Sequence, residues 1–450
     1  MTAPPSALLR AGRLLSLLLL AGLVACSGTR QPTRIQRELL AGAREAAERG
    51  DYAAAASRYR ALAQAGLARA QRELGRLYAA GRGVPRDPER ALSWLRKAAE
   101  QGDLPAMRTL AAMLLAGEGT PRNTVAALTW YRLAAERNDP IAMHRLGRLL
   151  LRGEEDIAVD LEGAVTWLGE AARRGYLPAR IDLADALVAR GAPGDAGEAE
   201  RLYRRARAEL ERRAETGDAW ALEQLGRLHL AGKGVPANAR RAAAYYERAL
   251  ARGRERVRLK LARLYRDGGP DLPPDRAAAL RLYTVAADAG DAGAAYQAGR
   301  ILQEGGPEMA PDGRGAAYYL RLAAERGERR AFLRLGDLLA DPGLPPTDPA
   351  AARHWYLQAG LAGDGKGFYR LGRIAEGAER PARALMWYRL AAEAGYARAE
   401  SRVARLLRRL SPGEVEESAV ELARFRLRNG IAPAAGPRAV PALESPPVQP

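Results

Sequence analysis

One stretch of sequence, residues 67–102, recurs along most of the chain and limits the possible folds more than any other feature. It has the pattern of two amphipathic helices joined by a glycine-rich turn, and each half spaces its apolar residues as one buried stripe. The stripes are Ala70, Leu74, Leu77 and Tyr78 in the first half, and Ala91, Trp94, Leu95 and Ala98 in the second. A single hairpin of this kind cannot cover its own apolar surface, so it requires a neighbour on each side.

The turn between the two halves carries residues that end one helix and begin the next. Gly81 and Gly83 suit the end of the first helix, where a residue that adopts positive φ easily is favoured. Asp87 offers a side-chain oxygen to the free N–H groups of the second helix, and Pro88 suits its first position because it lacks an N–H. Gly102 then closes the unit.

Further units of the same pattern follow without interruption, at residues 103–138, 139–175, 176–217, 218–253, 254–290, 291–327, 328–363 and 364–395. In the interior of each first helix one position is always glycine or alanine: Gly75, Ala111, Gly147, Ala184, Gly226, Ala262, Gly299, Gly336 and Gly372. Glycine inside a helix costs up to ~1 kcal/mol relative to alanine. Its return therefore predicts a place where the neighbouring helix comes too close for a side chain.

The second helices repeat an aromatic residue eight positions before the closing small residue. These residues, the aromatic row, are Trp94, Trp130, Trp167, Tyr245, Tyr319, Trp355 and Trp387; Leu282 takes the position once, beside Tyr283. We predict that the aromatic row and Tyr78 belong to the core rather than to a contact surface. On that prediction Trp130→Ala costs ~3–5 kcal/mol, as a large-to-small core change does.

Self-similarity at this period is typical of a stacked helical array, and the scarcity of β-branched residues leaves little material for a sheet. The residues resemble the Sel1-like repeats, a tetratricopeptide-related class of helical hairpin. The residues that carry the resemblance are Ala70-Leu74-Gly75-Tyr78, Gly81-Gly83-Val84, Asp87-Ala91, Trp94, Ala98-Ala99 and Gly102. The resemblance covers residues 35–395 and implies an all-α fold, a right-handed α-solenoid of about ten stacked helical hairpins. The unit at 176–217 departs from the pattern, since it lacks the glycine turn and the tryptophan and has a longer second helix.

Residues 1–25 have the pattern of a bacterial lipoprotein signal peptide. Two arginines precede an apolar run, residues 14–24, which is too short to span a bilayer as a mature helix. The next residues resemble a lipobox, in which the cysteine thiol is acylated and the chain is cut before it: Leu23-Val24-Ala25-Cys26. We expect lipid attachment at Cys26, with residues 26–34 as a tether, because two or more acyl chains anchor a protein stably.

The residue after the cysteine bears on the destination of the protein. Ser27, where aspartate would retain a lipoprotein at the inner membrane, suits transfer to the periplasmic face of the outer membrane. Cys26 is the only cysteine, so the chain forms no internal disulfide and its stability must come from stacking.

The two ends of the array differ from its middle, as terminal repeats usually do. Residues 35–66 predict a leading, tetratricopeptide-like hairpin, and residues 67–395 the main solenoid. Residues 396–430 predict a capping pair of helices, in which Ser411 and Glu414 form a capping box. The segment 431–450 is rich in proline and alanine and predicts a disordered tail.

The sequence offers no constellation for catalysis. The three histidines, His144, His229 and His354, lie in different units without a partner at metal-ligand spacing, so we interpret them as surface or groove residues. The Gly-x-Gly turns follow helices and lack a terminal Lys-Ser/Thr, which favours helix capping over phosphate binding. We therefore predict no catalytic residue, no metal and no cofactor.

The chain has a formal net charge of +18, which becomes +16 once Arg10 and Arg13 leave with the signal peptide, and nearly all of it is arginine. Two interpretations stay open: a GC-rich codon usage with solvated helix faces, or an arginine-lined groove that attracts an anionic polymer. An exported lipoprotein meets little nucleic acid, so an anionic polysaccharide or an acidic protein is the expected partner.

Three classes of function fit these observations. The order of lipobox, leading hairpin, repeats and terminal Leu410-Ser411-Pro412 helix pair resembles the lipid-anchored Sel1-like scaffolds of alginate and related exopolysaccharide export. That resemblance implies partners among outer-membrane export porins and periplasmic polysaccharide-modifying enzymes. The alternatives are direct binding of an anionic polysaccharide and a regulatory or stress adaptor of the envelope.

Overall fold

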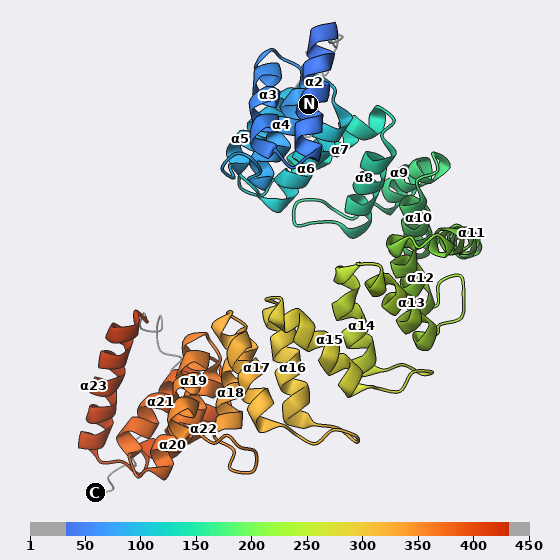
Figure 1. Ribbon diagram of the computed structural model, residues 1–450. Coiled ribbons are helices and arrows are strands. Elements are labelled where there is room, and N and C mark those ends of the chain that lie inside the picture. The colour runs from blue at the N-terminus through green and yellow to red at the C-terminus, as the bar shows by residue number, and fades with distance from the viewer. Residues whose placement is uncertain (1–32, 432–450) are drawn as a thin grey trace, which may run out of the picture. The chain divides into compact units, whose positions relative to one another are not determined.

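The computed structural model describes residues 33–431, and every regular element there is a helix. The predicted signal peptide, Cys26, nearly all of the predicted tether and the predicted tail beyond residue 431 lie outside the described residues. Within 33–431 the chain forms α-helices α2 to α23 and one short 3-10 helix, η1 (Glu255–Val257), which confirms the predicted all-α solenoid of stacked hairpins (Figure 1).

The chain divides into two compact units. Unit 1 comprises described residues 33–209 and Lys233–Val235, and its helices are α2 (Arg34–Glu48), α3 (Tyr52–Gln64), α4 (Ala68–Ala80), α5 (Pro88–Glu100), α6 (Leu104–Ala116), α7 (Thr124–Glu136), α8 (Pro140–Arg152), α9 (Leu161–Arg173), α10 (Leu177–Arg190) and most of α11 (Asp195–Glu215).

Unit 2 comprises Leu210–Gly232 and the described residues from 236 onward. Its helices are α12 (Ala219–Ala231), α13 (Ala239–Ala251), α14 (Arg258–Asp267), α15 (Arg276–Asp288), α16 (Ala292–Glu304), α17 (Gly313–Glu325), α18 (Arg329–Leu339), α19 (Pro349–Leu361), α20 (Gly365–Gly377), α21 (Pro381–Glu393), α22 (Arg398–Leu407) and α23 (Pro412–Asn429).

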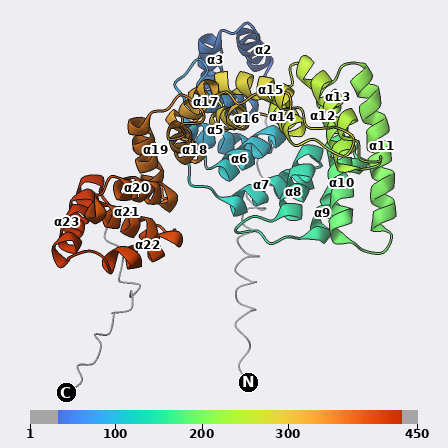
Figure 2. The same cartoon turned by 90° about the horizontal axis from the view of Figure 1, so that it is seen from below.

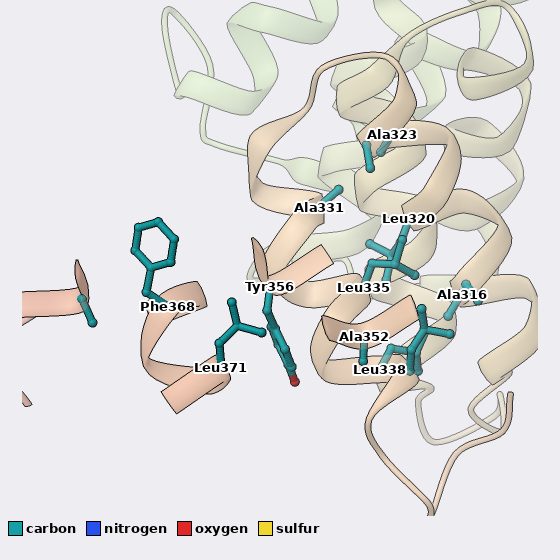
Figure 3. Packing of buried hydrophobic residues seen from close by; sticks show 14 of the residues in the cluster. Ala316, Leu320, Ala323, Ala331, Leu335, Leu338, Ala352, Tyr356, Phe368 and Leu371 are labelled. Carbon is teal, nitrogen blue, oxygen red and sulfur yellow. The ribbon is translucent and has the colours of Figure 1, made fainter. Parts of the chain in front are cut away.

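Stacking follows one rule inside each unit. A second helix packs against the first helix of its own repeat and against the first helix of the next repeat, as α17 does against α16 and α18. Figure 3 shows the result in unit 2, where Leu320 from α17 lies beside Leu335 from α18, and Leu338 from α18 lies near Ala352 from α19. All three leucines are fully buried, so the core is a continuous row rather than a single centre.

The recurring glycine marks the closest contact within each repeat, as predicted. A Cβ atom built on Gly147 would lie 2.6 Å from Cγ of Leu168, and one on Gly226 would lie 2.6 Å from Cε1 of Tyr246. Contacts this short do not occur between real atoms, so in these repeats the first helix can approach the second this closely only with glycine at this position. The same pairing recurs as Gly75–Leu95, Gly299–Leu320, Gly336–Tyr356 and Gly372–Tyr388.

The core register of the second helices differs by one residue from the prediction. In the repeats that carry the glycine, the residue after the aromatic-row residue faces it and is buried, as Leu168 faces Gly147. Tyr131 takes the same place in the repeat that carries Ala111 and is 3 % exposed. Trp130 itself is only partly buried. Trp387 and Tyr78 are buried as predicted. The other members of the aromatic row are only partly buried, and among them Tyr319 and Trp355 pack against the core of unit 2.

The predicted helix ends are largely confirmed. The Asp87 carboxylate accepts a hydrogen bond from the Arg90 amide, Pro88 occupies the first turn of α5, and Gly81 ends α4 in the left-handed conformation. The second glycine has another role: a Cβ on Gly83 would collide with the backbone of Tyr52, at the start of the preceding second helix. Gly83 therefore serves contact between repeats rather than capping.

The last two helices do not form a hairpin of their own. Ser411 and Glu414 make the predicted capping box at the start of α23. However, α22 and α23 both pack against α21, and both views place α23 beside α21 (Figures 1 and 2). This arrangement lays α23 across the aromatic residue of the last complete repeat.

Candidate interaction surface

The first helices α4, α6, α8, α12 and α20 each carry a contact that joins their repeat to the next. In each of them the residue three positions before the recurring glycine or alanine reaches the residue at which the next repeat begins. In α4 and α6 this residue is arginine: Arg72 pairs with Asp103 and Arg108 with Asp139, each at an N–O distance of 2.7 Å. Both aspartates also accept backbone N–H groups at the start of the next helix. One carboxylate thus caps a helix and holds the preceding repeat, and we name this pairing the junction contact.

In other repeats the junction contact is made by different types of side chain. His144 and Tyr176 meet edge to face with ring centroids 5.2 Å apart, and Tyr369 and Tyr396 lie 5.0 Å apart. In α12 the charges are reversed, because the acid Glu223 lies on the first helix and the base Arg254 begins the next repeat, 2.9 Å away. The position is fixed by the fold, and its chemistry varies from repeat to repeat.

Glu223 is the most buried carboxylate of this surface, with 2 % of its area exposed. Besides Arg254, it accepts hydrogen bonds from Arg256 and from Lys260, the latter at 2.6 Å. Burial alone would raise the pKa of Glu223, but the hydrogen bonds from Lys260, Arg256 and Arg254 outweigh it and lower the pKa to about 2. A carboxylate held ionised in this way is unsuited to general acid–base work near neutral pH, and its role is to hold the repeats together.

Many of the arginines likewise form ion pairs with carboxylates of a neighbouring repeat. Pairs that link one repeat to the next in unit 2 are Arg334–Glu304 at 2.6 Å, Arg370–Asp337 at 3.0 Å and Arg405–Glu376 at 2.7 Å. Among the described residues, the exposed Arg145, Arg263 and Arg373 of the first helices have no ion pair within 4.0 Å. The sequence left the arginine excess open between codon usage with solvated helix faces and an arginine-lined groove. The structure adds a third use, since part of it forms ion pairs between neighbouring repeats.

The aromatic row forms a second, less polar surface on the second helices. Its members outside the last complete repeat keep part of their area in contact with solvent. Basic side chains lie over two of them, with Lys97 4.4 Å from the Trp94 ring and Arg248 5.7 Å from the Tyr245 ring. Partly exposed aromatic side chains are enriched at protein interfaces, whereas sequence periodicity alone assigned these residues to the core.

The histidines are placed differently from the prediction. His144 and His229 are buried, and only His354 is exposed. The Nε2 atom of His144 lies 2.7 Å from the Asp182 carboxylate, and the His229 ring stacks on Tyr245 with centroids 5.4 Å apart. Two of the three are therefore packing residues of first helices, a role that the apolar spacing of α8 and α12 could have indicated.

Other kinds of site are not found in the part of the chain that the structure describes. No group of three histidine, cysteine, aspartate or glutamate side chains gathers there to hold a metal ion. No helix between residues 33 and 431 combines the length and apolar character needed to cross a bilayer. The predicted lipid attachment site, Cys26, lies outside this range.

The repeats match a family model, the Sel1 repeat, at residues 68–103, 104–139, 140–176, 221–253, 258–291, 292–328, 333–364 and 369–396. The matches cover more than half of the sequence. The chain belongs to the Sel1 repeat family. The unmatched stretch between 176 and 221 holds α10 and α11, where the sequence lacks the glycine turn and the second helix extends over 21 residues, as expected.

Solved structures with similarity to this Sel1 repeat protein include a protective antigen of uropathogenic Escherichia coli that displays an SLR fold, with 25% identity, TM-score 0.42 and coverage of 84% of this chain and 80% of that one. A Sel1 repeat protein from Oxalobacter formigenes has 24% identity, TM-score 0.41 and coverage of 63% and 96%. An immunity protein from Pseudomonas aeruginosa has 19% identity, TM-score 0.32 and coverage of 62% and 89%. No curated protein matches the chain at a significant level. Membership of the Sel1 repeat family indicates a scaffold for protein–protein interaction.

Proposed function

We propose that this Sel1 repeat protein is a non-catalytic scaffold, anchored by lipid to the periplasmic face of the outer membrane, that organises partner proteins for exopolysaccharide export. The observation that carries the scaffold role is the aromatic row. It repeats a partly exposed aromatic side chain on second helices of both units and so offers several similar contact points along the stacked repeats.

Two features of the sequence support the location and the pathway. The lipobox ending at Cys26, followed by Ser27, supports attachment to the outer membrane. The order of lipobox, leading hairpin, repeats and terminal helix pair resembles the scaffolds of alginate and related polysaccharide export. The proposed partners are therefore an export porin and periplasmic polysaccharide-modifying enzymes.

The test is site-specific photo-crosslinking in intact cells. A photoreactive residue replaces Trp130 on the aromatic row, and a matched one replaces Arg145 on the neighbouring first helix. Mass spectrometry then identifies the captured proteins. Capture of a porin or polysaccharide-modifying enzymes at position 130, and not at 145, supports the proposal; capture of unrelated envelope regulators at both positions contradicts it.

The anchor has its own test. Cys26→Ser removes the thiol that accepts the lipid, so the variant should no longer incorporate a labelled fatty acid in growing cells. A control substitution, Ser27→Ala, leaves the thiol in place and should incorporate the label like the natural protein. If Cys26→Ser also incorporates the label, lipid attachment at this residue is wrong.

A second candidate function is direct binding of an anionic polysaccharide. The observation in its favour is that Arg263 and Arg373 occupy the same position of two first helices, are exposed, and have no ion pair among the described residues. Double substitution to alanine should then weaken retention on immobilised alginate at low salt, while the second-helix control Arg383→Ala has no effect. Equal retention of all variants would exclude this candidate.

A further inference from the structure

Two neighbouring repeats of unit 2 carry the same pair of stacked rings. In one, Phe368 of α20 stacks on Trp387 of α21 with centroids 5.8 Å apart and an interplanar angle of 19°. In the other, Phe332 of α18 stacks on Trp355 of α19 at 5.9 Å and 23°. Each phenylalanine lies four residues before the recurring glycine. We name these pairs the C-terminal shelf and the α19 shelf.

The C-terminal shelf is occupied by the chain itself. Phe425 of α23 lies edge-on to both rings, 5.0 Å from Trp387 and 6.1 Å from Phe368. This contact leaves Trp387 only 9 % exposed and Phe368 4 % exposed, which makes Trp387 the one buried member of the aromatic row. An aromatic residue on an amphipathic helix is therefore the natural occupant of such a shelf.

The α19 shelf has the same rings without that cover. Phe332 and Trp355 remain partly exposed, and within the described residues the other ring against Trp355 is that of the exposed His354, 5.2 Å away. The underside of the shelf packs against the core of unit 2, so its shape is fixed before any partner arrives.

The rims of the two shelves differ in polarity. Six residues after Trp387 stands Glu393, which pairs with Arg426 of α23 at 2.5 Å. Six residues after Trp355 stands Leu361, which is 38 % exposed. A helix seated on the α19 shelf would therefore meet an apolar rim at the place where α23 meets a carboxylate.

We propose that the α19 shelf is a docking site for an amphipathic helix of a partner protein. The helix presents an aromatic side chain to Phe332 and Trp355, as Phe425 does on the C-terminal shelf, followed by an apolar residue in place of Arg426. This inference names the kind of partner segment that the proposed scaffold binds, and to that extent it rests on the scaffold role.

The test uses the full chain and a fluorescent peptide of residues 411–430 that carries Arg426→Leu, followed by anisotropy. We expect saturable binding, which weakens at least about ten-fold with Trp355→Ala in the chain or Phe425→Ala in the peptide. Trp94→Ala, a member of the aromatic row in unit 1, is the matched control and should not change the affinity. Circular dichroism confirms that each variant is folded.

A second variant separates docking from a structural role of Trp355. Leu361→Glu gives the α19 shelf the charge of the C-terminal rim without touching its rings. It should reverse the preference, so that the peptide with the natural Arg426 binds more tightly than the peptide with Arg426→Leu. A merely structural tryptophan cannot produce such a reversal.

Three results would overturn the inference: no saturable binding of the Arg426→Leu peptide, binding lost with Trp387→Ala instead of Trp355→Ala, or a dimer of the chain that Trp355→Ala dissociates. The second would mean that the peptide displaces α23, and the third that a second copy covers the shelf. Because the assay needs neither membrane nor native partner, its failure would leave the scaffold proposal to the crosslinking test.

Discussion

The contact between the recurring glycine and the second helix acts at the scale of single atoms. Gly147→Ala places a Cβ 2.6 Å from Cγ of Leu168 and 3.2 Å from its backbone nitrogen, and the backbone cannot move away freely. We expect a loss of about 1–3 kcal/mol in unfolding free energy, measured by urea denaturation. The control is Gly169→Ala in α9, where the nearest atom lies at 3.7 Å. It should be neutral or stabilising by up to ~1 kcal/mol.

The shifted core register changes the expected effect of removing an aromatic ring. Tyr131 is 3 % exposed and faces the first helix, so Tyr131→Ala should cost about 3–5 kcal/mol. Trp130→Ala removes a partly exposed ring and should cost about half as much. Thermal melts of the two variants show which substitution costs more stability. A larger loss of stability for Trp130→Ala would support the register predicted from sequence.

Glu223 makes stability depend on pH. Its pKa in the folded chain is about 2, below the ordinary value of 4.5, so its stabilising contribution is present above pH 4.5 and is lost as pH falls toward 2. Between pH 7 and pH 3 this should remove about 1–2 kcal/mol, allowing for the partial exposure of its cationic partners. Glu223→Gln should flatten the acid limb of the stability curve, whereas the exposed control Glu325→Gln should not. Parallel curves for all three proteins would exclude this role.

At the scale of the element, the junction contact joins one helix to the cap of another. Asp103→Asn keeps a side-chain oxygen for the Ala106 amide but removes the charge that faces Arg72, so the cap and the ion pair can be separated. In a double-mutant cycle with Arg72→Met we expect a coupling energy of about 1–3 kcal/mol, because both side chains are largely buried. A coupling below ~0.3 kcal/mol would mean that capping alone accounts for Asp103.

The elements themselves were the part best predicted from sequence, since stripes such as Ala70, Leu74 and Leu77, and caps such as Asp87, are local signals. The register of the second helix was not predicted correctly. Trp130 and Tyr131 are adjacent and both aromatic, and only the packing shows which of them faces the recurring glycine or alanine of the first helix. The junction contacts were also missed. Arg72 and Asp103 are 31 residues apart, and no local rule pairs them.

At the scale of the whole molecule, the described repeats of each unit pack mainly against their neighbours, so a local defect should remain local. Leu168→Ala removes a fully buried side chain of α9 and should cost about 2–5 kcal/mol. Amide hydrogen exchange should rise in α7 to α10 and stay unchanged in α20 and α21 of unit 2. A uniform rise along the chain would instead show that the array unfolds as one cooperative body.

The reversed polarity at Glu223 and Arg254 has a consequence for how near-identical repeats find their proper order during folding. A repeat carrying Arg72 fits a neighbour that begins with aspartate, and it would face a like charge if it met the repeat that begins with Arg254. The junction contacts at Arg72 and Glu223 therefore disfavour mispairing between repeats of opposite polarity, and mispairing is a characteristic failure of tandem-repeat proteins.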